Sequence, residues 1–349
     1  MSRPDVKRYS WRQRAGKWLR EQAKAEIVLP VIIAAGLLAY VSSVAAAPRS
    51  GGELWLVVQH TWFLILVLTI PYLAARALVW HELLLRVCIR IPWRQLLVAF
   101  AGGELTKSLP AGVYTQNYLL GRLEHFNRHS FVRSSMATTA MLGLETAIAL
   151  PIAMIIGIPG APWLFWTLLA IVLAWIAVII VAWMLVRVGI ARTDPEKHAL
   201  RRRAAIVAME FLEAAGDLVT WRTLRSLIPT AIYMLIYVID LYAILRALGV
   251  DNISFIHTMA VYAVIVLAVV LIPIPTELGI TELTGLGALT AYGVPGSVAA
   301  VAMLSMRLLA TGMTILVAAL LLFVMRGEFA RARAEERQDV RGSEASASG

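Results

Sequence analysis

Long apolar runs separated by short polar segments dominate the chain, and their lengths predict membrane-spanning helices. A helix needs about 20 residues to cross a hydrocarbon core that is roughly 30 Å thick. Six runs reach this length, at residues 27–47, 54–79, 134–158, 163–186, 227–248 and 297–324. The pattern therefore predicts an all-α polytopic membrane protein with six full spans.

Two further apolar regions are broken near their middle by proline and glycine. Region 95–123 is interrupted at Leu109–Gly112, and region 254–293 at Pro273 and Pro275. At 1.5 Å per residue, the arm 95–108 would reach only about 21 Å, so a re-entrant helical hairpin is expected there. The arm 254–271 would reach about 27 Å, which leaves two alternatives, a second hairpin or two more spans and eight in all.

The basic residues predict an orientation, because short cytoplasmic loops carry an excess of Lys and Arg. With the N-terminus inside, segments 1–26, 76–94, 122–133, 187–225 and 326–341 would be cytoplasmic, and they hold 28 of the 32 Lys and Arg residues. Both termini are therefore predicted to be cytoplasmic. The net charge of +10 is then mainly an orientation signal and not a sign of nucleic-acid binding.

This topology divides the membrane region into two inverted halves. Residues 27–158 and 163–325 each run span, span, hairpin, span, and the hairpins at 95–123 and 254–293 enter from opposite sides. Inverted halves with broken helices are typical of alternating-access transporters. Outside them we expect a basic amphipathic cytoplasmic segment at 1–26, an interfacial helix at 201–225 and a disordered cytoplasmic tail at 326–349.

Composition removes several other classes of protein. Apolar residues make up 60% of the chain, charged residues 15%, and the mean hydropathy is +0.75, which excludes a set of soluble domains. Cys88 is the single cysteine, so an internal disulfide and a multi-cysteine metal site are excluded. The basic segments instead suit the anionic headgroups of a membrane surface.

Ionisable side chains inside the predicted membrane segments are the main candidates for function. Each costs on the order of 2.5–3.5 kcal/mol to insert, so each needs a partner or a role. The candidates for substrate binding or proton coupling are Glu104, Lys107, Glu145, Asp240, Glu277, Glu282 and Arg307.

Several partners are open for these charges. Glu104 and Lys107 are three residues apart and could pair with each other or contact a headgroup. Arg307 could neutralise Glu145 or Glu282, or bind a lipid phosphate. Glu145 and Asp240 could carry a coupling proton, although a hydrogen bond between Asp240 and a nearby tyrosine hydroxyl is an equal alternative.

The proline breaks offer a second kind of site, because a helix that begins within the membrane presents free N–H groups to an anion. The two candidate helix starts are 112–117, which contains Gln116 and Asn117, and 276–281, which contains Glu277. Simple kinked core helices are the alternative.

No motif for catalysis is present. The chain lacks a zinc-protease helix, a G-x-S-x-G elbow and a phosphate-binding glycine loop, so no cofactor or metal is expected.

One stretch resembles the transmembrane region of lysylphosphatidylglycerol synthases and their stand-alone flippase-like relatives. It runs Ile272–Glu282 and is followed by Tyr292–Val294, Ala299–Ala300 and Arg307; upstream, Leu109–Gly112, Glu145 and Ala247–Val250 have counterparts. The resemblance implies the lipid-translocating half, without an aminoacyl-transferring domain. Gln116 and Asn117 stand where a basic residue would be expected, which disfavours an anionic phospholipid at that hairpin.

The leading hypothesis is a bacterial inner-membrane lipid translocase that moves a lipid or lipid-linked intermediate by alternating access. Its substrate site would combine Glu104, Lys107, Gln116, Asn117, Glu145, Glu277, Glu282 and Arg307. The alternatives are a membrane transferase that acts on a lipid-linked substrate, and a non-catalytic partner of a lipid or glycan synthase. Homo-oligomers are compatible with all three.

Overall fold

The computed structural model describes residues 50–107, 112–124, 126–160, 199–218, 220–271 and 279–325, with isolated positions between 166 and 184 and Gly327. Every regular element in these ranges is a helix. Within them, four helices are long and apolar enough to cross a membrane: Trp55–Arg86, Arg128–Ile156, Trp221–Ala247 and Gly296–Val324. They correspond to four of the six expected spans. The expected span at 27–47 and most of that at 163–186 lie outside the described residues.

The long elements are α2 (Ser50–Arg86), α5 (Arg128–Ile156), α9 (Leu227–Ala247) and a last span formed by α12 (Gly296–Met306), the π-helical turn η2 (Arg307–Thr311) and α13 (Gly312–Val324). The shorter elements are α3 (Trp93–Thr106), η1 (Gly112–Tyr114), α4 (Thr115–Leu123), α7 (Ala199–Leu218), α8 (Trp221–Leu224), α10 (Phe255–Leu271) and α11 (Ile280–Ala291). Helix α2 is longer than the run that predicts it, because it continues past Val79 to Arg86.

Helices α3 and α4 form the two arms on either side of the Pro110 break, and they pack against each other. The contact depends on glycine. A Cβ atom on Gly103 would lie 2.7 Å from the Cβ of Gln116, and one on Gly102 would overlap the side chain of Leu119. The backbones of α3 and α4 therefore approach more closely than a residue with a Cβ atom would allow.

Helices α10 and α11 form a second packed pair on either side of the second proline break. Here too a glycine lies at a close contact, because a Cβ atom on Gly285 of α11 would overlap the thioether of Met303 in α12. The hydroxyl of Tyr292, just after α11, donates to the carbonyl of Gly157 over 2.6 Å. This bond ties the end of the pair to the end of α5.

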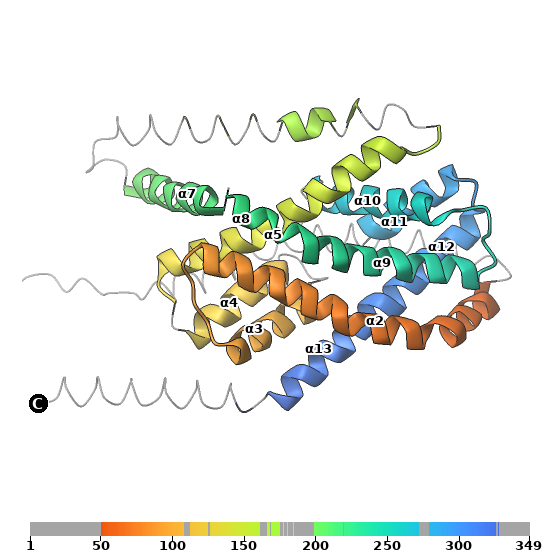
Figure 1. Cartoon of the computed structure of the whole chain (residues 1–349), viewed down its shortest axis with the longest axis horizontal. Coiled ribbons are helices and arrows are strands. Elements are labelled where there is room, and N and C mark those ends of the chain that lie inside the picture. Colours follow the sequence, from red (N-terminus) through yellow and green to blue (C-terminus); the bar gives the residue numbers. More distant parts are fainter. Residues whose placement is uncertain are drawn as a thin grey trace, which may run out of the picture.

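Helices from the two parts of the chain pack against one another. Helix α2 lies along α9, α10 lies along α5, and α3 lies against α13. Figure 1 shows α3 and α4 near the end of the molecule where α7 lies, and α10 and α11 toward the opposite end. A buried apolar cluster around Trp80, Leu83 and Phe100 fills the part next to α3 and α4.

Helix α7 covers part of the expected interfacial helix and is joined to α5 by ion pairs. Arg133 of α5 lies 2.5 Å from Asp217, and Arg128 lies 3.5 Å from Glu210. Helix α5 begins at a defined cap, where the side chain of Asn127 accepts a hydrogen bond of 2.8 Å from the Ser130 N–H. These contacts fix the start of the helix that carries Glu145.

Candidate functional site

Arg76 is the central charge of the site and is buried in the membrane-spanning helix α2, with only 3% of its surface exposed. Its Nε lies 3.2 Å from the Glu104 carboxylate of α3, and its Nη2 lies 3.9 Å from Oε1 of Glu145 in α5. Its Nη1 donates to the hydroxyl of Tyr72 over 2.6 Å. Tyr72 is four residues earlier, so both side chains lie on one face of α2.

Glu145 completes this first cluster. Its Oε1 also accepts a 2.7 Å hydrogen bond from the Tyr233 hydroxyl of α9. From the end of α3, the Lys107 ammonium reaches the Tyr72 hydroxyl at 3.4 Å. Four helices, α2, α3, α5 and α9, therefore meet at a single network of buried charges and tyrosines.

A second ion pair joins Glu282 in the first turn of α11 to Arg307 at the start of the π turn. Arg307 Nε donates to Glu282 Oε1 over 2.5 Å. The other oxygen of Glu282 accepts the backbone N–H of Gly279 over 2.7 Å. Gly279 has φ +82°, a left-handed conformation that favours glycine, so the chain can turn into α11 at this point.

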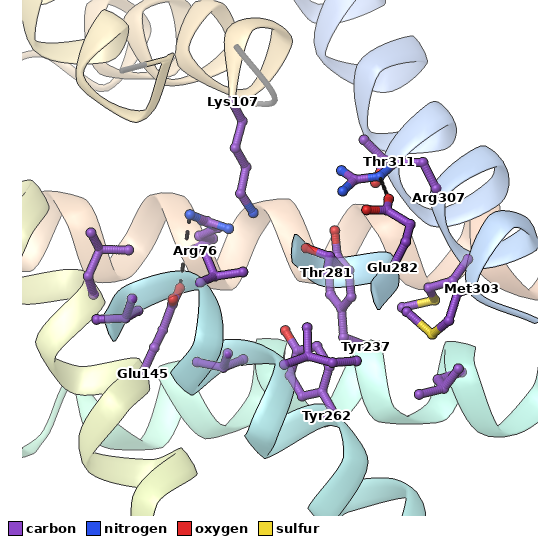
Figure 2. A pocket seen from close by; sticks show the side chains of 17 residues that line it. Arg76, Lys107, Glu145, Tyr237, Tyr262, Thr281, Glu282, Met303, Arg307 and Thr311 are labelled. Atoms are coloured by element: carbon purple, nitrogen blue, oxygen red, sulfur yellow. Dashed lines mark hydrogen bonds and ion pairs between the residues drawn. The ribbon is translucent and has the colours of Figure 1, made fainter. Parts of the chain in front are cut away.

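A cavity of about 90 Å³ lies between the two clusters. Figure 2 shows Arg76 and Lys107 at one end, Glu282 and Arg307 at the other, and Tyr237 and Tyr262 between them. The polar lining is Arg76, Lys107, Glu145, Tyr237, Tyr262, Thr281, Glu282, Arg307 and Thr311. The apolar lining is Leu142, Leu241, Ile265, Val266, Val269, Val270, Met303 and Met306.

The cavity unites four of the predicted site residues, because Lys107, Glu145, Glu282 and Arg307 all line it. Glu104 is buried and does not line the cavity, but it forms an ion pair with Arg76, which does. Of the two partners considered for Arg307, the structure shows Glu282. The other two carboxylates differ from expectation, because both Glu145 and Glu104 lie next to Arg76.

Three other candidates lie elsewhere. Gln116 and Asn117 are buried and hydrogen bonded to Thr138, so they join α4 to α5. Asp240 is buried in α9, and its Oδ1 has no hydrogen-bond partner within the described ranges, so the alternative of a bond to a tyrosine is not seen. Glu277 lies outside the described residues.

Sequence reasoning missed Arg76, which it counted among the cytoplasmic basic residues of 76–94. That placement is wrong, because α2 continues to Arg86 and buries Arg76. The sequence did hold a sign of this, because apolar residues continue after Arg76 at Trp80, Leu83 and Leu84. The structure buries all three fully. Arg76 therefore no longer counts among the cytoplasmic basic residues from which the orientation is predicted.

The side chains around the cavity can bind charged and polar groups. Cations, carboxylates and hydroxyls face one space, and the described residues contain no group of three His, Cys, Asp or Glu side chains that could hold a metal ion.

Four membrane-length helices around a charged cavity define a multi-pass membrane protein. The family model for the lysylphosphatidylglycerol synthase TM region matches residues 27–318, and the chain belongs to this family. The resemblance found in the sequence is thereby confirmed, and the family relates the chain to lipids in membranes. No curated protein and no solved structure matches the chain.

Proposed function

We propose that this protein is a lipid translocase, which moves a lipid or lipid-linked intermediate between the two leaflets of a bacterial inner membrane. The cavity carries this proposal. It combines three cationic and two carboxylate side chains with an apolar wall, and four membrane-length helices are packed around it. A headgroup crossing the hydrocarbon core needs such a polar site, because each buried charge is costly without partners.

The packing of the helices supports alternating access. If the two halves are inverted copies, α2 corresponds to α9, α3–α4 to α10–α11, and α5 to the last span. The contact of α10 with α5 then corresponds to that of α3 with α13, and α2 packs on its own counterpart. Re-entrant helix pairs at opposite ends of the molecule fit a central site that opens to each side in turn.

The orientation in this proposal keeps both termini in the cytoplasm. Its support is the excess of Lys and Arg in segments on that side, which persists without Arg76. The pair α3–α4 would then enter from the cytoplasm, and α10–α11 from the opposite side.

Transport of fluorescent phospholipid in proteoliposomes tests the proposal, with loss of signal after an impermeant quencher as the measurement. Wild-type protein should expose inner-leaflet lipid to the quencher. The double variant Glu282→Gln, Arg307→Gln removes the second ion pair without leaving one charge unpaired, and it should slow transport at least about tenfold. Arg90→Gln, at an exposed position, is the matched control.

Two results would count against the proposal. Absence of lipid movement by folded wild-type protein would reject translocation. Full activity of the double variant would reject the cavity as the path.

A further inference from the structure

We infer that the cavity accepts a zwitterionic phospholipid headgroup, with a phosphate and a primary ammonium and no net charge. The inference rests on the proposed function and names the substrate class for the same site.

The charges around the cavity balance. The described residues that form the two clusters include three cations, Arg76, Lys107 and Arg307, and three carboxylates, Glu104, Glu145 and Glu282. The nearby helix ends also offset each other. The C-terminal end of α3, capped by Lys107, carries partial negative charge, and the N-terminal end of α11, capped by Gly279, carries partial positive charge. Over the residues that the structure describes, the two clusters thus sum to zero charge. In a low-dielectric surrounding such a set of side chains favours a ligand of zero charge, since a net charge on the ligand would not be offset by them.

The cations that line the cavity suit a phosphate. Lys107 enters the space from the end of α3, and Arg307 lies across it on the last span, as Figure 2 shows. Ammonium and guanidinium groups donate charge-assisted hydrogen bonds to phosphate oxygens. A phosphodiester between these two side chains would therefore be bound from two sides.

The lining also contains acceptors that suit an ammonium group. Glu145 uses Oε1 for Tyr233 and Arg76, whereas its Oε2 has no hydrogen-bond partner in the part of the chain that the structure describes. The hydroxyls of Tyr237 and Tyr262 are likewise without partners among the described residues. Both tyrosines line the cavity with Glu145, so a donor placed there would meet three acceptors.

The two tyrosine rings add a second attraction for a cation. Tyr237 and Tyr262 are stacked, with ring centroids 5.6 Å apart and planes inclined by 23°. A ligand cation near the face of such a ring is attracted by its quadrupole, and the attraction grows when water is excluded. The neighbouring apolar wall, which includes Ile265 and Val269 of α10, suits the glycerol and the start of the acyl chains.

The experiment measures three acyl-labelled lipids in identical proteoliposomes: phosphatidylethanolamine, anionic phosphatidylglycerol and an uncharged glycosyl diacylglycerol. Phosphatidylethanolamine should move at least about tenfold faster than either of the others. Equal rates, or faster movement of phosphatidylglycerol or the glycolipid, would overturn the inference and leave translocation itself supported.

A charge change at Glu145 sharpens the test. Glu145→Gln keeps an acceptor for the Tyr233 hydroxyl but gives the cluster one excess positive charge. The preference should shift from phosphatidylethanolamine toward phosphatidylglycerol. The same exchange at the exposed Glu213, Glu213→Gln, should leave the preference unchanged. An unchanged preference in Glu145→Gln would overturn the role of this carboxylate.

If no lipid moves, the proposed function fails, and binding decides the headgroup inference. Short-chain phosphatidylethanolamine should then raise the melting temperature of the purified protein more than short-chain phosphatidylglycerol does. An equal or opposite effect would overturn the inference.

Discussion

Arg76 shows how a single residue can organise four helices. Its guanidinium is in contact with Tyr72 on its own helix, Glu104 on α3 and Glu145 on α5, and Glu145 in turn accepts from Tyr233 on α9. A planar fork with five donors can serve several acceptors at once, which an ammonium group cannot do in the same geometry. The first cluster therefore depends on arginine in particular.

Replacement of Arg76 should destabilise the protein strongly. Arg76→Gln leaves two buried carboxylates without their cation, at a cost of about 3–5 kcal/mol. We expect a large fall in melting temperature in detergent, a smaller fall for Arg76→Lys, and none for Arg90→Gln at an exposed site. A melting temperature of Arg76→Gln equal to that of the wild type would contradict the network around this guanidinium.

Asp240 of α9 presents the opposite case, a buried carboxyl group in which Oδ1 has no hydrogen-bond partner among the residues that the structure describes. A neutral amide of nearly the same shape costs less to bury than a charge, so Asp240→Asn should keep or raise the melting temperature. If Asp240 couples transport to protons, which is one of the two roles that the sequence suggests for it, the variant should move lipid at a rate that no longer responds to a pH gradient. A lower melting temperature of Asp240→Asn would refute the stability prediction, and transport that still responds to the pH gradient would refute the coupling role.

The sequence predicted which charged residues would meet at one place better than it predicted their partners. Lys107, Glu145, Glu282 and Arg307 stand out because charges are rare within apolar runs, and all four line the cavity. Their partners lie far away in the sequence, as in the pairing of Arg76 with Glu145, and only the packing of α2 on α5 brings them together. Spacing along one helix carries no information on such contacts.

At the scale of elements, glycine sets how closely the short helices pack. Gly103 lies where α3 meets Gln116 of α4, whereas a Cβ atom on Gly143 of α5 would have nothing within 4 Å. Replacement of glycine by alanine should therefore have opposite effects on stability at these two positions.

Gly103→Ala should lower stability by about 1–3 kcal/mol, because its methyl group would force α3 and α4 apart. Gly143→Ala is the matched control and should be neutral or stabilising by up to about 1 kcal/mol, because alanine favours the helix. Thermal unfolding of both variants in the same detergent provides the comparison. Equal effects would show that α3 and α4 are not in close contact at Gly103.

The sequence located these elements more reliably than it located their ends. Apolar runs predicted α5 and α9 to within a few residues at most ends, whereas α2 extends seven residues beyond Val79 because Trp80, Leu83 and Leu84 pack inside the protein. A hydropathy pattern reflects the lipid thickness, so it cannot indicate how far a helix continues against other helices.

At the scale of the whole molecule, the single cysteine gives a direct test of the proposed orientation. Cys88 is exposed in the connection between α2 and α3, which should face the cytoplasm. A membrane-impermeant maleimide should therefore label it only after the membrane is opened. In a Cys88→Ser background, Asp251→Cys should be labelled in intact spheroplasts, since the side chain of Asp251 is 86% exposed after α9. The reverse pattern would invert the topology.

The π turn in the last span leads to a prediction about the relatives of this chain. The π turn Arg307–Thr311 holds one residue more than a regular α-helix would need, so it corresponds to a single-residue insertion that the helix absorbs. Deleting that residue would turn α13, and its contact with α3, by about 100° relative to α12. An alignment of relatives should therefore show a one-residue gap here wherever the turn is absent, and the residues of α13 that face α3 should change together with it.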